Sequence, residues 1–325
     1  MRLAFMLVVL AVIALPAQAE LPVIRIAVLK FGTVNWLTET IRQRGLDAAE
    51  GYRLEVVPLA GKAATTIAFK ANDVDLIVSD WVWALRQREQ AGADLRFSPY
   101  SSALGALVAR PDAGVDGLCD LAGRSLGVVG GDLDKSWLIL QAVAQNQCDV
   151  SLTAETSTLF GAPPLMSRQL ETGAVDAVST YWHYASRLEA AGNRRLVDIA
   201  EAIEGLGIAP APPLVGFVWD ASRDLPGMAG FLRSVQAAGV VLAENDAQWD
   251  RLRPLMRVAN TAEFNGLRRD YRAGIPEPWQ AKDTAAAAEL HALLIEMGGP
   301  ALAAQTGRFD PEVFATPATA RRNGG

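Results

Sequence analysis

Residues 71–76 read Ala71-Asn72-Asp73-Val74-Asp75-Leu76, and residues 172–177 read Thr172-Gly173-Ala174-Val175-Asp176-Ala177. In each stretch a helical segment ends, a short turn follows, and Val-Asp opens an apolar run. Glycine at a helix end adopts positive φ without a steric clash, and the aspartate can accept hydrogen bonds from backbone N–H groups at the turn. The same helix-turn-strand unit is therefore predicted twice in the chain.

Apolar β-branched runs alternate with stretches of helical period on both sides of these two copies. Around the first copy the sequence predicts strands at 23–29, 54–59 and 74–79, and helices from Trp36, over 63–71 and over 81–91. Around the second it predicts apolar segments at 103–109, 125–129, 151–159 and 175–180, and helices over 133–145 and 164–172. This alternation is typical of βαβ units with a parallel sheet. We therefore expect an α/β protein with two lobes.

The boundary between the lobes is predicted from a proline-rich segment. Residues 208–213 read Ile-Ala-Pro-Ala-Pro-Pro and precede another apolar run at 214–219, so they are typical of a linker. Helices are predicted after this run, over 228–244, 249–258, 262–271 and 284–297. We expect lobe 1 to be discontinuous, with residues 20–103 and 214–325, and lobe 2 to comprise residues 104–213. Two crossings between the lobes would form a double-crossover hinge.

Composition excludes several classes of partner. The chain has 325 residues, of which 50% are hydrophobic and 20% charged, so it can bury a large core. Its 36 acidic residues outnumber its 30 basic ones and give a formal charge of −6. Nucleic acids and anionic membranes are bound by cationic surfaces, so we expect neither as a partner. A monomer is expected.

The first 19 residues have the pattern of a cleavable export signal. Arg2 supplies the positive start, residues 3–15 form an apolar run, and Ala17-Gln18-Ala19 fits the rule for cleavage after Ala19. A membrane anchor is the alternative, but the apolar run is shorter than the roughly 20 residues that a spanning helix needs. We expect a protein that diffuses freely in the periplasm.

Cys119 and Cys148 are the two cysteines of the chain. Cys119 precedes the strand predicted at 125–129, and Cys148 follows the helix that returns the chain to the edge where that strand began. Both thiols therefore fall at the same edge of the sheet, and oxidation is permitted in an exported protein. We expect a structural disulfide, with two buried free thiols as the alternative.

Three stretches in order resemble a known family. They are Asn72-Asp73-Val74-Asp75-Leu76, then Leu118-Cys119-Asp120-Leu121-Ala122-Gly123-Arg124-Ser125-Leu126-Gly127-Val128, then Leu170-Glu171-Thr172-Gly173-Ala174-Val175-Asp176-Ala177. Their order and spacing resemble the periplasmic solute-binding proteins of the nitrate, sulfonate and taurine importers, a family that includes binders of thiamine pyrimidine precursors. Asn72 and Arg124 stand where the family pattern has glycine and lysine. The resemblance implies a type II-like two-lobed binding-protein fold that closes on a small solute and presents it to an ABC importer permease.

The ligand is expected beyond the carboxyl ends of the strands, where open α/β sheets bind their ligands. Aromatic residues gather in or beside the loops predicted there, although each ring could instead pack within its lobe. Flat rings give contact area with little loss of entropy on binding. These aromatic residues are Trp36, Trp81, Trp83, Trp137, Tyr181, Trp182 and Tyr184.

Charged residues at the same strand ends point to two kinds of ligand. Lys30, Lys62 and Lys135 could hold an anionic head group together with free helix N-termini. Asp80, between a strand and a helix, could be a helix cap or could accept from an amine or an aminopyrimidine. If Asp80 faces the cleft, a zwitterion such as taurine or a heterocycle stacked on tryptophan fits better than nitrate.

Catalytic patterns are weak. His183 and His291 lack metal-ligand spacing, and no nucleophile elbow or phosphate loop is present, so we expect no metal, cofactor or enzymatic activity. The alternatives are an exported enzyme on the same fold, such as a prephenate-type dehydratase using Asp80 with Lys62 or Lys135, and a periplasmic sensor. The expected ligand-binding residues are Asn35, Trp36, Lys62, Thr65, Asp80, Trp81, Ser102, Lys135, Ser136, Tyr181 and Trp182.

Overall fold

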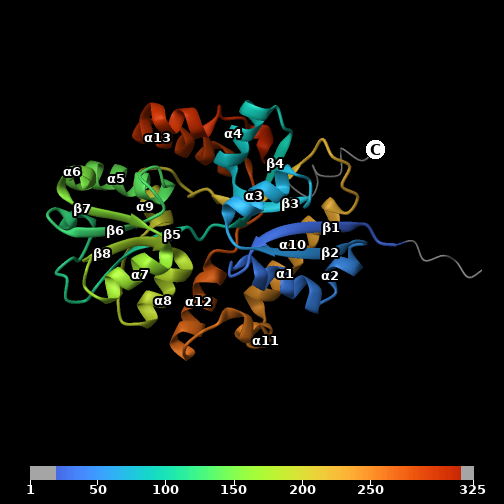
Figure 1. Ribbon diagram of the computed structural model, residues 1–325, viewed down its shortest axis with the longest axis horizontal. Coiled ribbons are helices and arrows are strands. Elements are labelled where there is room, and N and C mark those ends of the chain that lie inside the picture. Colours follow the sequence, from blue (N-terminus) through green and yellow to red (C-terminus); the bar gives the residue numbers. More distant parts are fainter. Residues whose placement is uncertain (1–19, 316–325) are drawn as a thin grey trace, which may run out of the picture.

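The computed structural model describes residues 20–315 and contains two five-stranded sheets (Figure 1). The first sheet has the order β2-β1-β3-β10-β4 and the second the order β7-β6-β8-β5-β9. We call the part of the protein built on the first sheet lobe 1 and the part built on the second lobe 2. The strands are β1 (Val23–Leu29), β2 (Arg53–Leu59), β3 (Leu76–Asp80), β4 (Leu95–Ser101), β5 (Gly105–Ala109), β6 (Ser125–Val129), β7 (Ser157–Gly161), β8 (Ala177–Tyr181), β9 (Arg194–Asp198) and β10 (Val215–Asp220).

The chain passes between the sheets twice, once between β4 and β5 and once between β9 and β10. The predicted two-lobed α/β fold with a double crossover is thus confirmed. The residue boundaries given above for the lobes stay a prediction. The export signal predicted at residues 1–19 and the last ten residues lie outside the described part of the chain.

Both sheets are mixed, whereas the sequence analysis expected parallel ones. In lobe 1, β2, β1 and β3 run parallel, but β10 is antiparallel to both β3 and β4. In lobe 2, β7, β6 and β8 run parallel, but β5 is antiparallel to β8 and β9. The expectation fails at β5 and β10 because these strands follow the crossovers and enter each sheet from the other lobe. Residues 151–159 were also expected as one apolar strand segment, but α6 (Leu152–Glu155) precedes β7 there.

The two Val-Asp turns occupy equivalent places in the sheets. Asp75 accepts the backbone N–H of Arg25 at 2.9 Å, and its own N–H donates to the carbonyl of Arg25. In lobe 2, Asp176 accepts the backbone N–H of Ser125 at 2.9 Å, and its own N–H donates to the carbonyl of Ser125. Each aspartate therefore joins the start of one central strand to the parallel strand beside it. This is the structural reason why the same turn appears in both lobes.

Helices cover both sheets (Figure 1). Most begin within two or three residues of their predicted starts, but α2, α8 and α9 were not predicted individually. The helices are α1 (Val34–Gln43), α2 (Leu46–Ala49), α3 (Lys62–Lys70), α4 (Trp81–Ala91), α5 (Lys135–Cys148), α6, α7 (Pro163–Glu171), α8 (Trp182–Ala190), α9 (Ile199–Gly205), α10 (Met228–Glu244), α11 (Asp246–Met256), α12 (Thr261–Ala273) and α13 (Ala281–Thr306).

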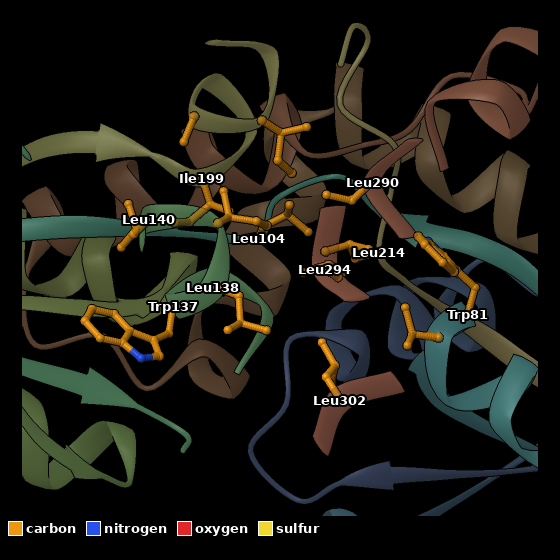
Figure 2. Packing of buried hydrophobic residues seen from close by; sticks show 14 of the residues in the cluster. Trp81, Leu104, Trp137, Leu138, Leu140, Ile199, Leu214, Leu290, Leu294 and Leu302 are labelled. Carbon is orange, nitrogen blue, oxygen red and sulfur yellow. The ribbon is translucent and has the colours of Figure 1, made fainter. Parts of the chain in front are cut away.

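Helix α13 packs on both lobes, against α4 of lobe 1 and α5 of lobe 2 (Figure 1). Its Leu290 and Leu294 belong to a buried hydrophobic cluster that continues from one lobe into the other. Figure 2 shows Leu104 and Leu214, one from each crossover, in the same cluster. Apolar side chains of α13 and of both crossovers therefore pack together where the two lobes are connected.

Helix α12 joins the lobes on the opposite edge, where it packs against α8 (Figure 1). This contact combines a buried aromatic pair, Trp182 of α8 with Tyr271 of α12, with several ion pairs. Asp270 of α12 is bonded to Ser186 and Arg195 of lobe 2, and Glu263 pairs with Arg187. The lobes are thus joined by apolar packing on one edge, and by ion pairs together with packing of Trp182 on the other.

The predicted disulfide is confirmed. Cys119 and Cys148 are bonded, with Cα atoms 5.4 Å apart. Cys119 lies in the short 3-10 helix Leu118–Leu121, and Cys148 is the last residue of α5. The bond ties the return of α5 to the segment before β6, in lobe 2.

Candidate functional site

A cavity of about 310 Å³ lies where the lobes meet. Lobe 1 lines it with the ends of β1, β3 and β4 and the first turns of α1 and α3, and lobe 2 lines it with the first turns of α5 and α8. Ala103 and Leu104 of one crossover and Leu214 of the other complete the wall. This is the location expected for a ligand of an open α/β sheet.

A carboxylate between two lysines is the main charged feature of the cavity. Lys62 Nζ lies 3.2 Å from Asp80 Oδ2, and Lys135 Nζ lies 3.3 Å from Asp80 Oδ1. Lys62 and Asp80 belong to lobe 1, whereas Lys135 begins α5 in lobe 2, so this cluster joins the two lobes. We call Lys62, Asp80 and Lys135 the interlobe charge cluster.

Asp80 also caps a helix. Its Oδ1 accepts the backbone N–H of Trp83 at 2.7 Å, in the first turn of α4. Burial by itself would raise the pKa of the Asp80 carboxyl, but Lys135, Lys62 and the Trp83 N–H outweigh it and hold that pKa well below its usual range. Asp80 is therefore ionised, and both of its oxygens already have donors.

Asp134 is a second carboxyl group in the cavity wall and was not predicted. It caps α5, because its Oδ1 accepts the backbone N–H of Ser136 at 2.9 Å. Burial raises the pKa of its carboxyl despite the nearby lysines. The charged side chains that line the cavity are thus two lysines and two aspartates, and their formal charges cancel when all four are ionised.

Most of the remaining wall is hydrocarbon or aromatic. Tyr100, Tyr181 and Trp182 contribute rings, and Leu29, Val34, Val78 and Leu214 contribute aliphatic groups. Burial, with the nearby charges of Asp134 and Asp80, raises the pKa of Tyr181 to about 12, and burial raises that of Tyr100 to about 12. Both phenols are therefore neutral, and the wall suits a ligand with an apolar body.

His183 contributes an uncharged polar ring to the wall. Burial, together with the charge of Arg187, lowers its pKa to about 4. Its Nδ1 is buried and has no hydrogen-bond partner within residues 20–315. At neutral pH this imidazole therefore adds no positive charge to the cavity.

Seven of the eleven residues named from the sequence line this cavity. Asp80, Lys62 and Lys135 form the interlobe charge cluster, and Thr65 and Ser136 lie one turn or one residue further along α3 and α5. The seven residues are Lys62, Thr65, Asp80, Lys135, Ser136, Tyr181 and Trp182.

The structure places the other four away from the cavity. Asn35 donates from its side chain to the carbonyls of Leu29 and Gly32, which shapes the turn after β1. Ser102 donates to the carbonyl of Gly274. Trp36 and Trp81 are packed inside lobe 1, Trp36 against Trp249 and Tyr271 and Trp81 against Phe309 and Phe314. We do not include these four in the site.

Several lining residues were missed by the sequence analysis. Tyr100 and Ser101 end β4, a strand that was not predicted because Pro99 interrupts its alternating pattern. Asp134 carried a usable signal, since aspartate is a common N-cap, but the helix was predicted to begin at residue 133 and so to include it. Thr33 and Ser79 were marked only by their place at or beyond the ends of the strands predicted at 23–29 and 74–79.

Comparisons with known proteins identify the fold. No protein-family model matches the chain, and no curated protein matches its sequence. The periplasmic aliphatic sulphonate-binding protein SsuA of Escherichia coli has a similar structure, with a TM-score of 0.65 and 17% identity over 85% of this chain and 87% of that chain. The alkanesulfonate-binding protein SsuA of Xanthomonas axonopodis pv. citri, bound to MOPS, gives 0.68 and 16% over 92% and 99%. The fold resembles that of two-lobed periplasmic binding proteins, as the sequence motifs implied.

The same fold also occurs in an enzyme. The desulfurization enzyme DszB matches with a TM-score of 0.59 and 17% identity over 90% of this chain and 97% of that chain. Fold alone therefore does not separate a binding protein from an enzyme. Within residues 20–315, no helix combines the length and the apolarity needed to cross a membrane.

Proposed function

We propose that this protein is the periplasmic solute-binding component of an ABC importer and that it captures a small sulfonate-like organic anion between its lobes. The observation that carries the proposal is the interlobe charge cluster. Lysines from opposite lobes converge on one carboxylate in a cavity whose other walls are mainly apolar. Such a cavity offers cationic hydrogen-bond donors to the anionic head group of a ligand and apolar contacts to the rest of that ligand.

Two helix ends support an anionic head group. Helices α3 and α8 begin without a side-chain cap, and residues of their first turns line the cavity. Uncapped N-terminal N–H groups carry a partial positive charge and favour an anion. In contrast, α4 and α5 are capped by Asp80 and Asp134, so their ends are already occupied.

The geometry disfavours taurine and the aminopyrimidines. Both need an acceptor for an amine, and Asp80 was the candidate. Its two oxygens are engaged by Lys62, Lys135 and the Trp83 N–H. An added amine would have to compete with two ammonium groups for the same oxygens, so a sulfonate with an alkyl or aryl body fits better.

A dehydratase role has less support. A general acid or base works best when its pKa lies near the operating pH. The pKa of Asp80 is held far below that range by the lysines, so it would neither give nor take a proton readily. Both cysteines are in the disulfide, so a thiolate nucleophile is also absent from the chain.

A thermal-shift screen tests the proposal. Benzenesulfonate, butanesulfonate, taurine, nitrate and an aminopyrimidine would be added to the mature chain. A ligand at 100 times its dissociation constant should stabilise the protein by about 2.7 kcal/mol. We expect a rise in melting temperature with the first two compounds and loss of that rise in Lys135→Met. Lys70→Met, at the exposed end of α3, is the control and should respond like the wild type. A response to the aminopyrimidine alone would refute the proposal.

A further inference from the structure

We propose that Asp80 limits the charge of the solute, so that the cavity accepts a monoanion and rejects a dianion of the same shape. The inference rests on the proposed function, because it concerns the head group of the captured anion. It assigns Asp80 a role in specificity beyond capping α4.

The side chains that line the cavity carry little net positive charge. Lys62 and Lys135 supply two positive charges, and Asp80 removes one of them. Asp134 removes the second when it is ionised, and His183 adds none near neutral pH. One negative charge on the ligand is thus the most that these side chains can balance, and they balance it when Asp134 is protonated, the state that burial of this carboxyl favours.

The Asp80 side chain is held in a fixed position beside the two lysines. It is 7% exposed, ends β3 directly before α4, and accepts the N–H of Trp83. A side chain fixed by a helix cap and two ion pairs keeps its charge at a constant place beside the ligand. An approaching anion therefore meets this carboxylate together with the lysines.

A second negative charge on the ligand would have no cationic side chain to pair with in the cavity. Beyond the cluster the wall consists mainly of aromatic and aliphatic groups, with neutral hydroxyls such as those of Thr65, Ser79 and Ser136, and it offers no further cation to a dianion. A second negative charge in such surroundings is unfavourable, because neutral hydroxyls and helix N–H groups compensate less of its lost hydration than a cation would. The penalty falls on the dianion alone, and this difference produces selectivity.

Phenyl sulfate and phenyl phosphate provide a matched test. They have the same shape, but the sulfate is a monoanion, whereas the phosphate has a second pKa of about 6 and is mainly a dianion at about pH 8. Dissociation constants would be measured by titration calorimetry, with benzenesulfonate as the reference. We expect wild-type protein to prefer phenyl sulfate at least about tenfold at pH 8. Equal affinities would overturn the inference and leave the proposed function standing.

Asp80→Asn then assigns the selectivity to this residue. Asparagine can still cap α4, so the change mainly removes a charge. We expect the preference for phenyl sulfate to fall about tenfold, through a gain in phosphate affinity. Asp132→Asn, on the exposed loop before α5, is the control and should keep the wild-type ratio. An unchanged ratio in Asp80→Asn would refute the role of Asp80.

A second measurement needs no variant. Lowering the pH from about 8 to about 5 converts phenyl phosphate largely to its monoanion, so wild-type affinity for it should rise relative to phenyl sulfate. Phenyl sulfate keeps its charge and corrects for any titration of Asp134 or His183. A ratio that does not change with pH would contradict the inference. Failure of all three compounds to bind, benzenesulfonate included, would refute the proposed function and the inference with it.

Discussion

Strands β3 and β8 are equivalent members of the two sheets, and they are alike at one end and different at the other. Asp75 and Asp176 stand at their amino ends and make the same backbone contacts. At their carboxyl ends the equivalent residues are Asp80 and Tyr181, each directly before a helix that begins with tryptophan. The amino ends, which are alike, hold neighbouring strands together, whereas the carboxyl ends, which differ, face the cavity.

The differing ends have different electrostatics. Asp80 caps α4 and pairs with two lysines, whereas Tyr181 leaves α8 uncapped and adds an aromatic ring. Trp81 is buried inside lobe 1, but its equivalent Trp182 lines the cavity. Changes at the amino ends should therefore affect stability, and changes at the carboxyl ends should affect binding.

The largest effect is expected from Asp75→Asn. Asp75 is 2% exposed and pairs with Arg25 and Arg223, so removing its charge leaves two guanidinium groups without a counterion. We expect a loss of about 2–4 kcal/mol in the free energy of unfolding. Asp176→Asn is the matched change, and there the main side-chain partner is the Ser125 hydroxyl, so about 1 kcal/mol is expected. Urea unfolding measures the free energy of unfolding of both variants. Equal losses would contradict the expected difference between the two aspartates.

The effect of Asp75 should also depend on pH. Although burial opposes it, hydrogen bonds and the charges of Arg25 and Arg223 lower the pKa of Asp75 below its ordinary value. A lowered folded-state pKa contributes stability that is fully present above the unfolded value of about 3.9 and is lost as the pH falls through the folded value. The stability difference between wild type and Asp75→Asn should therefore shrink as the pH falls below about 4. A difference that grows on acidification would contradict this assignment.

Much of this comparison could be predicted from the sequence. The Val-Asp turns, the alternation of strands and helices and the disulfide are local patterns, and each is present in the structure. Which of the equivalent residues Trp81 and Trp182 lines the cavity could not be predicted, because both directly follow a strand, both are buried, and only tertiary packing determines which ring borders the cavity. Strand β9 was missed because it begins with Arg194 and Arg195 and has no apolar alternation.

Among the binding variants, Lys135→Met should have the larger effect. Its side chain is 27% exposed against 60% for Lys62, so its charge is less screened by water. We expect benzenesulfonate affinity to fall about tenfold or more in Lys135→Met and less in Lys62→Met. Calorimetric titration gives both constants. A larger loss in Lys62→Met would mean that the lobe 2 lysine is not the main contact.

The smallest effect is expected from Tyr181→Ser, which gives α8 the side-chain cap that α4 already has. A serine N-cap contributes about 1 kcal/mol or less to stability, and it competes with the ligand for the first N–H groups of α8. We expect a severalfold loss of benzenesulfonate affinity without loss of folded protein. Tyr181→Ala also removes the ring but adds no cap, so it should bind benzenesulfonate more tightly than Tyr181→Ser does; equal affinities in the two variants would show that the uncapped helix end does not matter.

The central claim is that an organic anion binds between the lobes with its head group at the interlobe charge cluster. A crystal structure with 4-bromobenzenesulfonate, with anomalous scattering to locate the bromine, tests it most directly. The account predicts the sulfonate within hydrogen-bond distance of Lys62 and Lys135 and the bromine against the apolar wall near Trp182. Bromine in the groove between α5 and α13, beside Trp137 and Met297, with an empty interlobe cavity, would contradict it.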